Sequence, residues 1–197
     1  MAKRQMQMKG YGRIGGMLML IAAVELLLFV LLAQHIYPNY SLSSNYISDL
    51  GVGSTAIILN TSMELFGLML MASSYFMHKA GYLFPSIALL VAGAGGFCVG
   101  IFPETAGALH IVSAVTAFGA VAIASISFSR SFSKYLSYYS AAAGLLALSI
   151  LALFALNLST GSSMTFGFGS GGIEEILFYD ELIWASVTGL FFATNRA

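Results

Sequence analysis

Four carboxylic acids lie inside long apolar runs of the sequence: Glu25, Glu64, Asp180 and Glu181. An ionised carboxylate in the middle of a bilayer costs about 2.5–3.5 kcal/mol on insertion scales. Such an acid is therefore protonated, paired or turned toward a wet cavity, and an ionisable residue inside a membrane is by default a candidate for a functional site. The same four acids could also relay protons in a proton-coupled carrier.

Two histidines and three further acids lie near the ends of the apolar runs. His35 follows the first run and His110 opens the fourth, whereas Asp49 and Glu104 precede other runs and Glu174 opens the sixth. A histidine can act as a general base while a carboxylate orients it or serves as the acid. We therefore name His110, Asp49 and Glu104 as the candidate catalytic residues of a membrane hydrolase that would act on lipid.

The same histidines are candidate metal ligands. His35 and His110, together with one nearby carboxylate, would give three ligands and leave an open position on a zinc ion. The sequence contains neither H-x-x-x-H nor H-E-x-x-H, so spacing gives this hypothesis no support. The alternative for each histidine is an ordinary hydrogen bond.

The composition places the chain in a membrane. It is 58% hydrophobic and only 8% charged, whereas soluble domains are about 25% charged. No basic patch of the kind that binds nucleic acid is present in the sequence, and membrane lipids are the expected surroundings. Six apolar stretches reach the roughly 20 residues that a membrane helix needs. The sequence therefore predicts an all-α, polytopic bundle of six transmembrane helices that forms a single membrane domain over residues 1–197. These helices are expected at about 12–33, 55–76, 82–101, 107–128, 137–156 and 174–194.

The basic residues indicate how the chain is oriented. With six crossings, the N-terminus, the second loop, the fourth loop and the C-terminus all lie on one face, and every lysine and arginine falls in these segments. By the positive-inside rule this face is cytoplasmic. We expect cytoplasmic termini, outer loops at 34–54, 102–106 and 157–173, and a plasma-membrane location. The basic residues are Lys3, Arg4, Lys9, Arg13, Lys79, Arg130, Lys134 and Arg196.

The sixth helix is expected to border a cavity. Leu182 to Thr194 spans only 13 residues, or roughly 20 Å of helix, which is too short for a hydrocarbon core of about 30 Å. The helix must therefore begin near Glu174, and at 100° per residue Glu174 and Glu181 share one face. We expect its first half to be enclosed by protein or to border an outward-open cavity. The candidate binding residues of this cavity are Ser48, Glu64, Glu174, Asp180 and Glu181.

The third apolar run contains a pair of small residues at helical spacing. Gly96 and Gly100 lie four residues apart, and such pairs let two helix backbones approach closely. One interpretation is packing within this bundle. The other is contact with a second copy of the chain or with a membrane protein partner.

Two motifs resemble a known family. "YPNYSLSSNYISDLG" at 37–51 follows the first apolar run, and "GIFPETAGALH" at 100–110 leads into the fourth. Over nearly its whole length the chain resembles the six-pass membrane proteins of the domain of unknown function 998 family (DUF998), its archaeal members most closely. The resemblance implies a six-helix membrane protein and no particular activity. It points to Ser48, Asp49, Phe102, Pro103 and His110.

Together these observations predict a multi-pass membrane protein whose outer half carries a cluster of carboxylates and histidines. The cluster would bind a lipid, an ion or a protein partner. An outward-facing hydrolase with His110 as its base is the first alternative. The second is a proton-coupled carrier that uses Glu25, Glu64, Asp180 and Glu181. Whether the protein is an enzyme stays open at this point.

Overall fold

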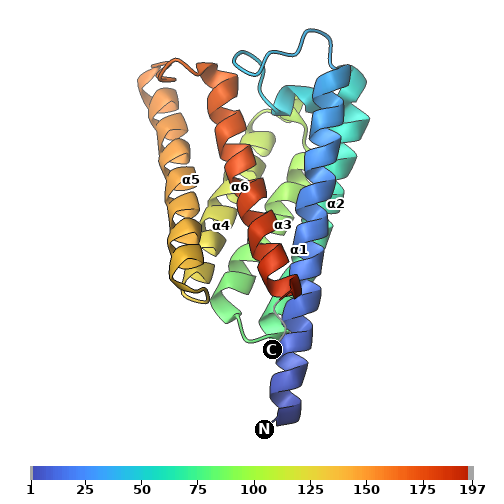
Figure 1. Ribbon diagram of the computed structural model, residues 1–197. Helices are drawn as coiled ribbons and strands as arrows, with labels where there is room; N and C mark the ends of the chain where they lie inside the picture. The colour runs from blue at the N-terminus through green and yellow to red at the C-terminus, as the bar shows by residue number, and fades with distance from the viewer. Residues whose placement is uncertain (1, 195–197) are drawn as a thin grey trace.

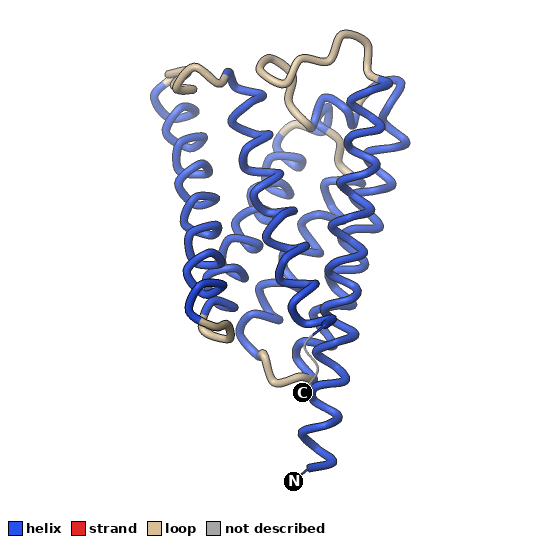
Figure 2. The backbone as a smooth tube through the Cα atoms, viewed as in Figure 1, coloured by secondary structure: helices blue, strands red, loops and turns tan. Residues whose placement is uncertain are grey.

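Six long helices run side by side in the computed structural model, which describes residues 2–194 (Figure 1). Each helix is long and apolar enough to cross a membrane, and the described residues contain no strand (Figure 2). The prediction of an all-α bundle of six membrane helices is therefore confirmed. The helices are α1 (Ala2–Ile36), α2 (Ala56–Lys79), α3 (Leu83–Ile101), α4 (Ala108–Ser129), α5 (Lys134–Thr160) and α6 (Gly169–Thr194).

Helices that follow one another in the sequence pack against one another, and α6 returns to α1 to close the bundle. Helix α5 packs mainly on α4 and makes a smaller contact with α6. One end of the bundle contains the start of α1 and the end of α6 (Figure 1). The segments that carry Lys9, Arg13, Lys79, Arg130 and Lys134 also lie at this end. Arg196 lies outside the described residues.

The opposite end, called the long-loop end below, is formed by residues 37–55, 102–107 and 161–168. Its longest segment folds back over the helices through two short 3-10 turns, η1 (Ser48–Gly51) and η2 (Gly53–Thr55). Leu50 and Thr55 are completely buried there, and the Thr55 hydroxyl donates a hydrogen bond of 2.8 Å to the Leu50 carbonyl oxygen. The segment is therefore part of the packed structure.

Helix α6 begins five residues before the expected position, at Gly169. The backbone N–H of Gly171 donates a hydrogen bond of 3.2 Å to the Ser43 carbonyl oxygen. A Cβ atom at Gly171 would collide with the Asn45 carbonyl oxygen. Glycines in the first turn of α6 thus allow the long loop to lie directly on the helix.

Glycines also bring helices of the bundle close together. A Cβ atom at Gly67 of α2 would lie 2.5 Å from the Gly93 carbonyl oxygen of α3, and a Cβ atom at Gly16 of α1 would lie 2.7 Å from the Gly189 carbonyl oxygen of α6. Both separations are too short for any side chain. Close backbone contact of this kind is typical of membrane helices, where packing replaces the hydrophobic effect.

The pair singled out in the sequence also faces α2. Gly96 lies against Phe66, and a Cβ atom at Gly100 would lie 2.6 Å from the Asn60 carbonyl oxygen. The two glycines are therefore used within the chain, as the first interpretation predicted.

Candidate functional site

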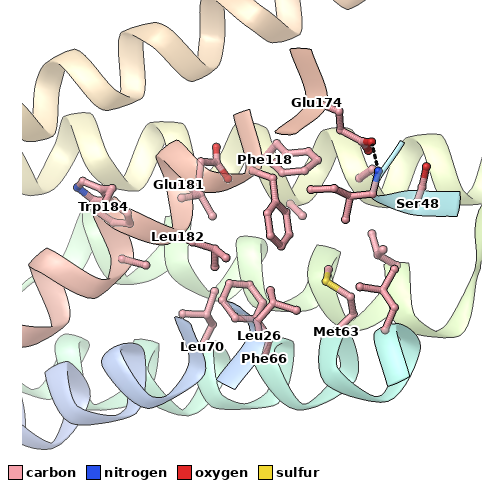
Figure 3. A pocket seen from close by; sticks show the side chains of 18 of the residues that line it. Leu26, Ser48, Met63, Phe66, Leu70, Phe118, Glu174, Glu181, Leu182 and Trp184 are labelled. Carbon is pink, nitrogen blue, oxygen red and sulfur yellow. Dashed lines mark hydrogen bonds between the residues drawn. The ribbon is translucent and has the colours of Figure 1, made fainter. Parts of the chain in front are cut away.

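A cavity of about 70 Å³ lies inside the bundle (Figure 3). All described helices except α5 line it, and the start of η1 covers it at the long-loop end. A cavity of 10–15 Å³ admits one water molecule, and an engineered apolar cavity of about 150 Å³ admits benzene. The space is thus sufficient for a narrow apolar group or for several waters.

The wall of the cavity is apolar except for a few side chains. Figure 3 shows the aliphatic and aromatic residues that dominate it, among them Leu26, Phe66, Phe118 and Leu182. None of the described residues that line it is a lysine or an arginine. The polar residues in the wall are Ser48, His110, Glu174 and Glu181.

Two glutamates of α6 mark different depths along the cavity. In Figure 3, Glu174 lies at one end beside Ser48, Trp184 lies at the other end, and Glu181 lies between them. Glu174 and Glu181 are two helical turns apart, or about 10 Å. Both line the cavity, so the expectation that they share one face of the helix is confirmed.

Glu174 connects the cavity to the long loop. Its Oε2 atom accepts a hydrogen bond of 2.6 Å from the backbone N–H of Ile47, shown as a dashed line in Figure 3. Ile47 is buried and directly precedes η1. The carboxyl group of Glu174 therefore holds the loop in place over this end of the cavity.

Glu181 is the most isolated polar group of the cavity wall. Its side chain is only 8% exposed, and its Oε1 atom is buried with no hydrogen-bond partner among the described residues. A buried oxygen without a partner costs free energy, typically 1–3 kcal/mol, and in a native structure it calls for a water, an ion or a ligand. Glu181 is consequently the group in the cavity that most needs a donor.

His110 is oriented by the backbone and not by a carboxylate. Its Nδ1 atom lies 2.8 Å from the Phe102 carbonyl oxygen. A carbonyl oxygen can only accept, so Nδ1 is the donor of this hydrogen bond and carries a proton. The Phe102 carbonyl oxygen therefore orients the imidazole in this structure, and the side-chain hydrogen bonds of Asp49 go to its own turn.

Asp49 stabilises the turn that contains it. Its Oδ2 atom accepts hydrogen bonds from the side-chain amide of Asn45 at 2.9 Å and from the backbone N–H of Tyr46 at 3.1 Å. Glu104 lies next to it. Burial raises the pKa of the Glu104 carboxyl above its ordinary value of 4.5, and the hydrogen bond and charge of Asp49 raise this pKa further. The two acids form a carboxyl pair at the long-loop end that does not line the cavity.

This pair predicts a pH dependence of stability. A carboxyl whose pKa is higher in the folded state stabilises the fold fully below its unfolded pKa of about 4.5, and this contribution is lost as the pH rises through the folded pKa. Glu104→Gln should therefore raise the melting temperature at pH 7 and leave it nearly unchanged at pH 4. Thermal unfolding of both proteins in detergent measures this. A variant that is less stable than the parent at pH 7 would contradict the prediction.

Three of the five expected binding residues line the cavity, and two do not. Ser48, Glu174 and Glu181 are part of its wall. Glu64 is packed against the Gly100 backbone of α3 instead. Asp180 lines a tight crevice between α4, α5 and α6. Hydrophobicity alone could not give the rotation of α2 that turns Glu64 away.

The remaining candidates lie apart. Both carboxyl oxygens of Glu25 are buried with no hydrogen-bond partner among the described residues, and the side chain lies beside Ser62 of α2. His35 is exposed at the end of α1. Within residues 2–194, no group of three His, Cys, Asp or Glu side chains could hold a metal ion. The described residues thus lack the arrangement that the zinc hypothesis requires.

A second acid of α6 holds the long loop from another side. Glu175 is buried, and its Oε1 atom accepts hydrogen bonds from Gln34 Nε2 at 2.8 Å and from the Tyr40 hydroxyl at 2.7 Å. Burial and this carboxylate raise the pKa of Tyr40, so the phenol stays protonated as a donor. Sequence reasoning missed this cluster, although a polar residue near the end of α1 and an acid near the start of α6 were available as signals.

Six helices that are long and apolar enough to cross a membrane, packed around an apolar cavity, define a multi-pass membrane protein. A family model described as "Protein of unknown function (DUF998)" matches residues 20–190. The chain therefore belongs to this family, as the two motifs at 37–51 and 100–110 predicted. No curated protein and no solved structure matches the chain.

Proposed function

We propose that the protein binds a lipid or another amphiphile inside the membrane, with a short part of the apolar chain of that molecule in the cavity. A single observation carries this proposal: the cavity wall is apolar except for Ser48, His110, Glu174 and Glu181. Ligand pockets generally combine apolar walls with a few placed polar groups that fix the orientation of the ligand. An amphiphile has the matching division into an apolar and a polar part.

The orientation in the membrane is part of this proposal. The described basic residues gather at the end opposite the long loop, and the positive-inside rule then makes that end cytoplasmic. The long-loop end faces outward, both termini are cytoplasmic and the membrane is the plasma membrane. The amphiphile accordingly enters from the outer leaflet.

Filling the cavity should prevent this binding. Ala114 of α4 lines the cavity, and Ala114→Phe would occupy the space that an alkyl chain needs. A long-chain alcohol with a photoreactive diazirine in its alkyl chain serves as the probe. Irradiation of the purified protein should attach the probe to cavity residues, and Ala114→Phe should reduce this labelling by about tenfold.

The matched control is Ala152→Phe, which adds the same side chain to the exposed surface of α5. This variant should keep the labelling of cavity residues. Melting temperatures of both variants establish that they fold. Equal labelling of cavity residues in a folded Ala114→Phe protein would refute the proposal.

A lipid hydrolase is the second candidate, because Ser48 and His110 line the same cavity. In a neutral imidazole, Nε2 of His110 would accept a proton from the Ser48 hydroxyl or from a water molecule and so act as a general base. Release of a fluorescent product from an ester lipid, with loss of this release in His110→Gln, would support the candidate.

Described helices α1 to α6 are unbroken and only Glu181 of the four intramembrane acids lines the cavity, so we do not propose a carrier.

A further inference from the structure

We propose that the cavity selects amphiphiles with a primary amine head, bound at Glu181, over amphiphiles with a neutral or anionic head. This inference rests on the proposed function and adds the chemical class of the ligand. It begins from Glu181, a residue of the cavity wall whose buried Oε1 atom has no hydrogen-bond partner among the described residues.

The polar groups of the wall favour a donor over an acceptor. An ionised carboxylate accepts hydrogen bonds only, an ammonium group offers three donors, and the ammonium charge favours the ionised form of a nearby acid. Glu174 already accepts a hydrogen bond from Ile47 through Oε2, whereas Glu181, farther along the cavity wall, has a buried oxygen without a partner. An ammonium group beside Glu181 would satisfy this oxygen and form a charge-assisted hydrogen bond, which is stronger than a neutral one.

The charges around the cavity disfavour an anionic head. No lysine or arginine is present among the described residues of its wall, so nothing there compensates a phosphate, sulfate or carboxylate head. Such a head would bring an unpaired charge into apolar surroundings, and an ionised Glu174 or Glu181 would repel it more strongly there than in water. A neutral alcohol would donate one hydrogen bond to Glu181 without this repulsion and should rank between the two.

The test is a competition experiment on the full chain in nanodiscs of uncharged lipid. Dodecylamine, dodecanol and dodecanoate, each below its micelle-forming concentration, compete at pH 7 with the photoreactive long-chain alcohol. In the parent protein the amine should halve the labelling at a concentration at least tenfold lower than dodecanol requires, and dodecanoate should be the weakest competitor. In Glu181→Gln the amine should lose its advantage, while dodecanol still competes.

Glu64→Gln is the matched control, because Glu64 is an acid of the same bundle that does not line the cavity. It should keep the tenfold preference. Equal competition by amine and alcohol in the parent protein, or strongest competition by dodecanoate, would overturn the inference and leave the proposed function standing. If cavity residues are not labelled at all, the proposed function fails as well.

Discussion

Replacing Trp184 with alanine is expected to lower the free energy of unfolding by about 3–5 kcal/mol, the usual range for truncating a buried tryptophan. Trp184 is 1% exposed in the middle of α6, and its ring centroid lies 6.3 Å from that of Phe128 in α4. Its indole N–H donates a hydrogen bond of 2.8 Å to the Ser140 hydroxyl of α5, which in turn donates one of 2.6 Å to the Ser125 carbonyl oxygen of α4. One residue therefore joins three helices.

Denaturant unfolding in mixed micelles, followed by circular dichroism, measures this loss. The control is Phe84→Ala, because Phe84 is 66% exposed on the surface of α3. Truncation at that position should change the free energy by less than about 0.5 kcal/mol. Similar losses for the two variants would show that Trp184 does not connect the helices as described.

Gly67→Ala is expected to cost about 1–3 kcal/mol, the range for overpacking a tight contact. The new Cβ atom would lie 2.5 Å from the Gly93 carbonyl oxygen and from the Phe97 backbone nitrogen. Backbone atoms cannot rotate away as a side chain can, so α2 and α3 would have to separate. The unfolding free energy and the yield of folded protein should both fall.

Gly119→Ala makes the same chemical change where there is room. The nearest atom to a Cβ at Gly119 is Leu151 Cδ1 at 3.9 Å. Alanine favours a helix over glycine by up to about 1 kcal/mol, so this variant should be neutral or more stable. We therefore expect Gly67→Ala to lower the stability and Gly119→Ala to leave it unchanged or raise it. A loss of stability in both variants would contradict this prediction.

The number of helices followed from the sequence because hydropathy and helix length are properties of single segments. The shared face of Glu174 and Glu181 followed as well, since it depends only on the rotation of one helix. The sequence did not show which side of each helix faces the interior of the bundle. Lipid and protein interior are both apolar, so the pattern that orients a helix in a soluble protein is weak in a membrane.

The candidate site likewise combines features that the sequence predicted with features that it did not. Glu64 and Glu181 have the same side-chain chemistry and both lie in apolar runs, but only Glu181 lines the cavity. The partner of His110 is a backbone carbonyl, and every residue type carries one. Trp184 offered a signal, since it is the only tryptophan of the chain and its N–H needs a partner when buried.

Glu174 takes part in two structures at once, as a part of the cavity wall and as the acceptor for Ile47 at the start of the covering turn. The binding of a molecule in the cavity and the attachment of the loop therefore both involve the same carboxyl group. Thermodynamic coupling is reciprocal. A molecule that competes with Ile47 for this carboxyl would weaken the attachment of the loop. Detachment of the loop would strengthen the binding of that molecule, and the two equilibrium constants would change by the same factor.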